Sequence, residues 1–368
     1  MALTPRARPR GPSRAIALLC ALGVLAAGCH GDPGTIKAEP VGPAPPVPRW
    51  ASIGCTGGTL TTGRHRFQGR DFLVKTPDQP KQEPQDPQDQ SPAPLILDLH
   101  GLNSSGFEQA VYGRLADAGA ARGFTVVEPD SASGRAGWKL PGMADGDADI
   151  GYVGALLDHL EKGLCLDRRR EYAAGFSNGA GLAAALVCGL GGRLAGVAAV
   201  SGLNLARPCP RPAPTTIVAF HGTDDPVVPY DGGEPFGGNR AQVPSWMAPS
   251  DGSFDLPSVA SAAAAWGRAF SCATSTSADA ASGVRRRSWT GCRRDARVDL
   301  YTVSGAGHAW PGSFAVGAGA STKKIDATAV TLDAFATGTG RWHGRHEFPS
   351  PDITGANGDR SPYTATTP

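Results

Sequence analysis

The sequence has little of what marks proteins that bind metals or nucleic acids. No two of its eight cysteines have Cys-x-x-Cys spacing, so we do not expect a zinc site. The formal net charge is only +2, which leaves no basic surface typical of nucleic-acid binding. The apolar stretch at residues 15–28 is too short to favour a membrane-spanning helix, and the sequence has no internal repeat.

The composition fits an enzyme-sized globular chain with many loops. Its 368 residues are enough for one large α/β domain or two modest ones. Apolar residues make up 40% of the chain, which is enough for a substantial core, and 50 glycines with 32 prolines indicate many turns.

The N-terminus has the pattern of an export signal. A basic region at residues 6–14 precedes the apolar stretch, which ends in "AAGC" at Cys29. The small residues before Cys29 resemble a bacterial lipoprotein cleavage box, although Ala26 stands where such a box usually has Leu. We therefore predict a lipoprotein-type signal peptide at 1–28 with Cys29 lipidated. Simple secretion and an uncleaved membrane anchor are the alternatives.

Cys20 lies in the predicted signal and Cys29 in the cleavage box, so six cysteines remain, and an even number in an exported chain indicates disulfides. Cys188 and Cys209 both fall near the lower edge of the predicted sheet, so they can pair. Cys272 follows a predicted helix and Cys292 lies at the turn of a late hairpin, so these two can pair. By elimination, Cys55 pairs with Cys165.

The rest of the chain divides into a tether, one domain and a tail. We predict a Pro-rich tether at 29–50, a single α/β domain at 51–340 and a C-terminal tail at 341–368. Within the domain, the polar, Pro-spaced segment 78–94 reads as a mobile loop insert.

The domain itself alternates strands and helices. A hairpin that turns at Gln68–Gly69 is followed by strands at "LILDLHG", "FTVVEPD", "REYAAGFS", "LAGVAAVSG" and "TTIVAFHG". Helices are predicted at 107–123, 148–164 and in "NGAGLAAALVCGL", with a closing helix at "IDATAVTLDAFAT" and a late hairpin before it. This rhythm predicts a mostly parallel sheet with helices on both faces.

Three strings at predicted strand ends carry the chemistry. In "GFSNG", Gly175 and Gly179 flank Ser177 at a strand-to-helix turn, the pattern of a nucleophile elbow. A serine needs a base and the base needs an acid. His308 in "GAGHAWPG" and Asp225 in "HGTDDPVVPY" complete the order Ser, Asp, His of α/β-hydrolases. The adjacent Asp224 is the alternative acid.

Further residues are predicted to support this site. The backbone N–H groups of Asn178 and Leu102 are candidates for an oxyanion hole, because one begins the helix and the other follows the first long strand. We interpret His100 and His221, each in an "HG" pair at a strand end, as structural residues and not as the catalytic base. Trp138, Trp246 and Trp310 flank the site, so each is a candidate for substrate binding, although each can equally pack in the core.

With these residues identified, the chain resembles the secreted esterases of carbohydrate esterase family one, which include feruloyl esterases, acetylxylan esterases and polyhydroxybutyrate depolymerase-like proteins. The matching strings are "LDLHG", "AAGFSNGA", "AFHGTDDPVVPY", "LPSVASAAAAWGRAFSC" and "GAGHAWPG". The resemblance implies an α/β-hydrolase fold and favours Asp225 over Asp224 as the acid.

The resemblance also implies an exported serine esterase that acts on plant polysaccharide esters and needs no metal or organic cofactor. A polyhydroxybutyrate depolymerase, a plain carboxylesterase and a lipoprotein that binds ligand without turnover are the alternatives. We expect an ester substrate, no nucleic-acid partner, membrane association only through a lipid anchor, and a monomer.

Overall fold

The computed structural model describes residues 48–77, 91–132, 136–248, 254–315 and 319–337. All of them belong to Pro46–Pro368, which its internal contacts separate from Met1–Pro45. The predicted signal peptide, Cys29, nearly all of the tether, residues 78–90 of the insert and the tail lie outside the described residues. In the described part, no helix combines the length and apolarity that crossing a membrane requires.

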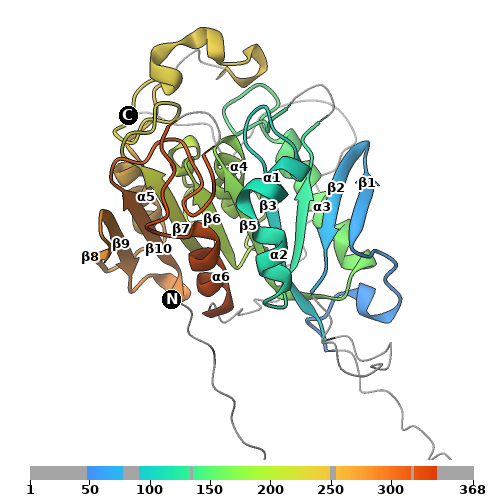
Figure 1. Cartoon of the computed structure of the whole chain (residues 1–368). Coiled ribbons are helices and arrows are strands. Elements are labelled where there is room, and N and C mark those ends of the chain that lie inside the picture. The colour runs from blue at the N-terminus through green and yellow to red at the C-terminus, as the bar shows by residue number, and fades with distance from the viewer. Residues whose placement is uncertain (1–47, 78–90, 133–135, 249–253, 316–318, 338–368) are drawn as a thin grey trace, which may run out of the picture. The chain divides into compact units, whose positions relative to one another are not determined.

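Ten strands form a single sheet (Figure 1). Its order is β1-β2-β4-β3-β5-β6-β7-β10-β9-β8. The six central strands, from β4 to β10, pair in parallel, and two strands at each edge pair antiparallel. The strands are β1 (Gly63–Phe67), β2 (Arg70–Lys75), β3 (Ala93–Leu99), β4 (Thr125–Pro129), β5 (Leu166–Phe176), β6 (Gly196–Val200), β7 (Thr216–Gly222), β8 (Thr274–Ala281), β9 (Val284–Thr290) and β10 (Arg297–Val303).

Helices cover both faces of the sheet. In Figure 1, α1, α2 and α6 lie in front of the sheet, and α3, α4 and α5 lie behind it. The α-helices are α1 (Gly106–Gly113), α2 (Leu115–Ala120), α3 (Ala148–Gly163), α4 (Asn178–Gly189), α5 (Val259–Ala269) and α6 (Ala327–Thr337). Short 3-10 helices are η1 (Ile53–Thr56), η2 (Leu203–Leu205), η3 (Pro235–Gly238), η4 (Arg240–Gln242), η5 (Ser245–Met247) and η6 (Arg293–Asp295).

The core lies where the central strands meet these helices. All seven residues of β3 are buried, as expected for a strand covered on both faces. Helix α4 is rich in Ala and Gly, and its residues from Asn178 to Val187 are all buried between the sheet and η2. This architecture, with the elbow serine between β5 and α4, confirms the predicted α/β-hydrolase fold.

Two elements differ from the sequence prediction. The helix predicted at 107–123 is broken at Arg114, which has a left-handed backbone (φ 52°). The hydroxyl of Thr328 donates to the carbonyl of Gly113 at 2.6 Å, which supplies a partner from α6 at the break. Strand β8 was not predicted as an element of its own, because its sequence "TSTSADAA" has no apolar alternation and is almost entirely exposed.

Two boundaries are also informative. The first hairpin turns at Gln68 and Gly69, both with positive φ, as predicted. Strand β3 begins at Ala93, so the last residues of the 78–94 insert belong to the sheet.

Three disulfides join the same pairs that the sequence predicts. Their partners are Cys55 with Cys165, Cys188 with Cys209, and Cys272 with Cys292. The first fastens η1 to the segment before β5, where the Ser52 hydroxyl also donates to the Leu164 carbonyl and accepts from the Leu166 N–H. The third closes the start of β8 against the end of β9, which compensates for the small amount of apolar surface that β8 buries.

The sheet also contains two neighbouring buried carboxyl groups. Asp98 on β3 and Glu128 on β4 are at most 1% exposed. Burial raises the pKa of Glu128 to about 9, with further contributions from Asp98 and Asp117. Burial likewise raises the pKa of Asp98 to about 7, although a hydrogen bond from Gln109 opposes the shift. In the folded state Glu128 therefore stays protonated at neutral pH, whereas Asp98 keeps its proton only below about pH 7.

We predict that these groups make the protein less stable as pH rises. From pH 5 to 9 the unfolded chain ionises Glu128 while the folded chain keeps its proton, so the free energy of unfolding falls by about 1.4 kcal/mol per pH unit for this site. Glu128→Gln cannot ionise and should therefore lose stability less steeply. Urea unfolding at pH 5, 6, 7 and 8 measures both slopes. Glu234→Gln, at an exposed glutamate, should keep the wild-type slope. Equal slopes for wild type and Glu128→Gln would contradict the assignment.

Candidate active site

Ser177 lies on the tight turn that joins β5 to α4. Its backbone has φ 54° and ψ −120°, a conformation that side-chain-bearing residues rarely adopt. Its N–H donates to the Val200 carbonyl on β6 at 2.8 Å, which fixes the turn to the neighbouring strand. A Cβ on Gly179 would overlap the carbonyl oxygens of Leu99 and His100, so this position requires glycine. The turn presents the serine above the carboxyl ends of the parallel strands.

Asp225 follows β7, and both of its carboxylate oxygens accept hydrogen bonds. Oδ1 accepts the backbone N–H groups of Val227 and Val228, each at 2.9 Å. Oδ2 accepts Nδ1–H of His308 at 2.8 Å and lies 3.3 Å from Nε2 of His221. Asp224, by contrast, is exposed, and its Oδ1 accepts from the Thr223 hydroxyl. His308 is therefore paired with Asp225, and Asp224 makes no contact with this histidine that would let it act as the acid.

The carboxyl group of Asp225 is held in its ionised form. Burial by itself raises its pKa, but the hydrogen bonds and positive potential of His221 and His308 outweigh burial and hold the pKa well below its ordinary value. His221 also donates from Nε2 to the Val228 carbonyl at 2.8 Å. Such a carboxylate can orient the His308 ring and stabilise an imidazolium. It leaves Nε2 of His308 as the nitrogen that can accept a proton.

Trp138 connects the two segments that carry the predicted oxyanion donors. Its indole N–H donates to the His100 carbonyl at 2.9 Å, two residues before Leu102. Its backbone N–H donates to Oδ1 of Asn178, and its carbonyl accepts from Nδ2 of Asn178 at 2.9 Å. One buried tryptophan thus holds the loop of Leu102 and the first residue of α4 in a fixed relation.

His100 supports the same loop. Its Nδ1–H donates to the Gly101 carbonyl at 2.7 Å, and its Nε2 accepts the Ser131 N–H at 3.1 Å. Burial lowers the pKa of His100, although neighbouring acidic groups oppose this. The hydrogen-bond pattern matches a neutral ring with its proton on Nδ1.

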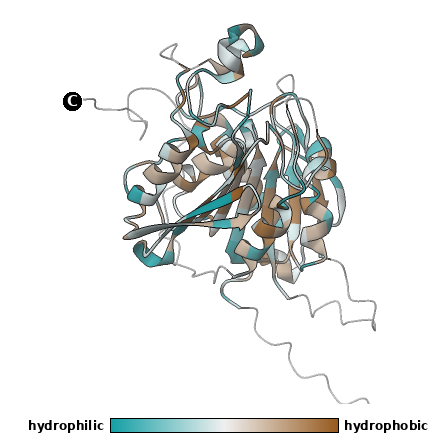
Figure 2. Cartoon of the chain, turned by 60° about the vertical axis from the view of Figure 1, so that its left-hand side comes forward, coloured by the Kyte–Doolittle hydropathy of each residue, from teal (hydrophilic) through white to brown (hydrophobic). Residues whose placement is uncertain are grey.

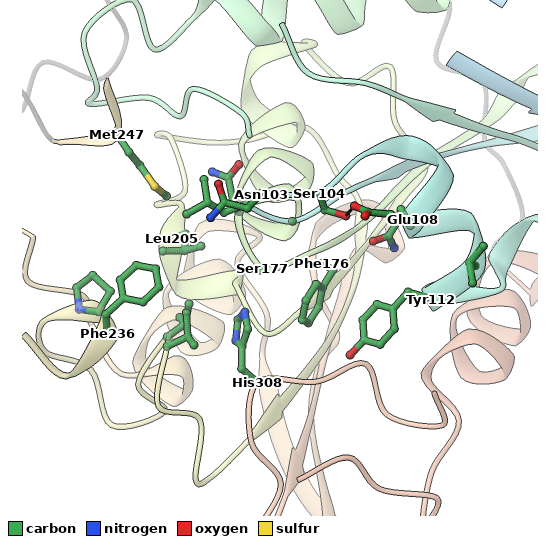
Figure 3. Close-up of a pocket in the computed structure, with 18 of the residues that line it drawn as sticks. Asn103, Ser104, Glu108, Tyr112, Phe176, Ser177, Leu205, Phe236, Met247 and His308 are labelled. Carbon is green, nitrogen blue, oxygen red and sulfur yellow. Dashed lines mark hydrogen bonds between the residues drawn. The ribbon is translucent and has the colours of Figure 1, made fainter. Parts of the chain in front are cut away.

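A cavity of about 670 Å³ opens over Ser177 and His308, and Leu102 and Asn178 also line it. Figure 3 shows Ser177 and His308 between two sides of the pocket, with Phe236 and Met247 on one side and Tyr112 on the other. The first side is formed by the segment after β7 and its neighbours: Leu205, Val227, Val228, Pro235, Phe236, Met247 and Phe254. The second side comes from α1, from the end of β5 and from the loop that carries Phe314: its residues are Phe107, Val111, Tyr112, Phe176 and Phe314. A polar wall of Asn103, Ser104 and Glu108 lies between them.

The prediction that Trp138 and Trp310 line the pocket is wrong. Both are at most 1% exposed, and their indole N–H groups bond to protein atoms. The Trp310 indole donates to the Thr328 hydroxyl at 2.9 Å on α6, so the ring packs between α1 and α6. Trp246 is partly exposed and its ring lies close to Gly137, near the pocket but not among the side chains that line it.

The aromatic residues that do line the pocket were missed in the sequence. Phe176 directly precedes Ser177, and its ring centroid lies 4.8 Å from that of His308. The elbow string itself contained this signal, because the residue before the nucleophile has to lie beside it. Tyr112 precedes Phe176 by 64 residues and Phe314 follows it by 138, so no local sequence pattern places the three residues together. Within the described residues, no group of three His, Cys, Asp or Glu side chains could hold a metal ion.

Comparison with known proteins identifies relatives among feruloyl esterases. A protein named "Probable feruloyl esterase C" from Aspergillus niger is 30% identical over 215 residues, which cover 55% of this chain and 74% of that protein. Feruloyl esterase C from Emericella nidulans is 31% identical over 182 residues, covering 48% of this chain and 62% of the relative. Feruloyl esterase B from Piromyces equi is 28% identical over 230 residues, 59% of this chain and 40% of the relative.

Two other comparisons add less. No family model matches the chain. Among solved structures, the acetyl xylan esterase from Aspergillus awamori has a TM-score of 0.46 at 12% identity, and the similarity covers 73% of this chain and 94% of that one.

We predict that the Trp138 indole N–H supports turnover rather than substrate binding. Trp138→Phe leaves the His100 carbonyl without its donor and loosens the loop of Leu102, so kcat for ester hydrolysis should fall by about tenfold while KM changes little. An arylboronic acid, which forms a tetrahedral adduct with the serine, should lose affinity in parallel.

The matched control for this variant is Trp266→Phe. Trp266 is also fully buried, and its indole nitrogen has no hydrogen-bond partner among the described residues. That change should lower stability without a selective effect on kcat. An unchanged kcat in Trp138→Phe would contradict the assignment.

Proposed function

Because this chain belongs to the feruloyl esterase C family, we propose that it is an exported serine esterase that releases aromatic acids such as ferulic acid from plant polysaccharide esters. One observation carries the proposal most directly. The pocket that contains Ser177 and His308, the latter paired with Asp225, has apolar and aromatic side chains on two sides, which suits an aromatic acyl group better than acetyl.

The chemistry is acyl transfer to water through a covalent intermediate. The Ser177 hydroxyl attacks the ester carbonyl while Nε2 of His308 takes its proton. Asp225 keeps Nδ1–H of His308 in place at 2.8 Å and balances the charge of the imidazolium. His308 then gives the proton to the departing alcohol. A water molecule attacks the acyl-enzyme by the same route and releases the acid.

The developing negative charge on the carbonyl oxygen needs donors that are already in place. The backbone N–H groups of Leu102 and Asn178 fill this role. The N-terminus of α4 adds a favourable field, because its dipole is positive at that end. Both residues line the pocket together with Ser177, and Trp138 holds their segments in register.

A substrate panel tests the proposal. Purified protein is assayed with methyl ferulate, acetylated xylan, hydroxybutyrate oligomers and short p-nitrophenyl esters. We expect methyl ferulate to give the highest kcat/KM of the natural-type esters. Ser177→Ala should lower turnover by about a millionfold and should abolish labelling by a fluorophosphonate probe. Faster hydrolysis of hydroxybutyrate oligomers would identify a depolymerase instead.

Adjacent aspartates give a matched control for the acid. Asp225→Asn should lower kcat by about ten-thousandfold, because the amide cannot hold the same His308 tautomer. Asp224→Asn, at the exposed neighbour, should remain within twofold of wild type. The reverse order of damage would overturn the assignment of the acid.

We also propose that the mature protein is a monomer attached to the membrane surface through lipid on Cys29. The lipid attachment rests on the "AAGC" string and on the Pro-rich segment that follows it. Labelled palmitate should be incorporated into the wild type and not into Cys29→Ser, which should be released in soluble form. A mature N-terminus elsewhere, without lipid, would leave a simply secreted enzyme.

A further inference from the structure

Exposed large apolar side chains of the described residues concentrate at one edge of the pocket. Four stand out: Ile53 at 70% exposure, Phe107 at 58%, Phe314 at 51% and Val111 at 49%. The last three line the pocket, whereas Ile53 lies on η1 and does not. Apolar side chains left exposed together beside a cavity commonly mark a binding surface.

This edge continues inward as a row of aromatic rings. The ring centroids of His308 and Phe176 are 4.8 Å apart. Those of Phe176 and Tyr112 are 5.2 Å apart, and those of Tyr112 and Phe314 are 5.5 Å apart. The last two contacts are edge-to-face, at 67° and 74°. Figure 3 shows the inner part of this row, with Phe176 between His308 and Tyr112. The row therefore runs from the proposed catalytic base to the surface.

The outer part of the row is held in place. The Tyr112 hydroxyl accepts the backbone N–H of Trp310 at 2.7 Å, and the Tyr112 carbonyl accepts the Ser313 hydroxyl at 2.6 Å. These two bonds fix the segment that carries Phe314 to α1. Helix α1 is itself fixed at its start, where the Gly106 N–H donates to Asp130 at 2.7 Å. A rigid apolar surface of this kind binds a ring at low cost in conformational entropy.

The neighbouring polar wall limits what can bind there. Glu108 is on the same helix as Phe107 and accepts from the Ser104 hydroxyl at 2.9 Å. Its carboxylate would repel an anionic group on the ligand. The surface therefore fits a ring without a negative charge.

We propose that Phe107, Val111, Tyr112 and Phe314 form a second aromatic subsite, which binds a neutral aromatic ring that the ester carries beyond the ring next to Ser177. The preferred substrates are then esters with two linked aromatic units. The proposal rests on ester hydrolysis at Ser177 for its catalytic readout, but the subsite itself is a binding surface that can be measured without turnover.

Two methyl esters test the subsite: methyl ferulate and its 4-O-benzyl ether, which adds one neutral ring. The readout is the ratio of kcat/KM for the benzyl ether to that for methyl ferulate. We expect this ratio to fall by about tenfold in Phe107→Ser/Phe314→Ser relative to wild type. Ile53→Ser removes an even more exposed apolar side chain away from the pocket and should leave the ratio unchanged.

A binding measurement separates this proposal from the proposed function. In Ser177→Ala, both esters stay intact, and calorimetry gives their dissociation constants. Adding the two rim changes to this variant should weaken binding of the benzyl ether selectively, by about tenfold. If wild type hydrolyses neither ester, the proposed function fails, and this binding ratio still decides the subsite.

Two outcomes would overturn the subsite. The first is an equal ratio in wild type and the rim variant, in turnover and in binding. The second is a gain for both esters in the rim variant, which would indicate that part of the chain occupies this surface. Single Phe107→Ser and Phe314→Ser variants provide the same readout if the double variant folds poorly.

Discussion

The site depends on backbone segments that approach one another more closely than side chains would allow. Gly179 lies against the carbonyls that end β3, and Gly202 lies against the carbonyl of Ser177 itself. Because no Cβ intervenes, the ends of β3, β5 and β6 meet around the serine. The strained backbone of Ser177 persists because these neighbours fix it from several sides. Main-chain packing therefore sets where the nucleophile and the loop before Leu102 can lie.

Polar groups then hold this arrangement with little freedom to reorganise. Both oxygens of the Asp225 carboxylate accept hydrogen bonds, and both ring nitrogens of His100 are bonded. Trp138 satisfies the His100 carbonyl while its own backbone pairs with the Asn178 side chain. Groups that are bonded before substrate arrives do not have to be ordered during the reaction, which is where preorganised sites gain their advantage.

Much of the fold could be predicted from the sequence because its signals are local. Buried strands such as β3 are mostly apolar, and the elbow glycines report a steric requirement at their own positions. The tryptophans could not be placed in this way. Whether Trp310 turns toward the pocket or toward Thr328 depends on α6, which follows it in the chain and packs on the sheet independently. Strand β8 could not be predicted for a related reason. It is held by its pairing with β9 and by the Cys272–Cys292 bond, and its sequence has no apolar pattern.

The polar character of β8 has a consequence for an exported protein. A sheet of ten strands ends in two edges, and an open edge is a template to which another chain can add. At this edge the strand is rich in Ser and Thr and almost entirely exposed, and its ladder with β9 is irregular between Asp279 and Ala281. In Figure 2, where this side comes forward, the hairpin of β8 and β9 carries hydrophilic residues. At the other edge, Arg64 and Arg66 are exposed on β1. Charge, hydroxyl groups and a bulge all discourage growth of the sheet from one molecule to the next. The two edges of the sheet are therefore protected by the chain's own residues and need no partner to cover them.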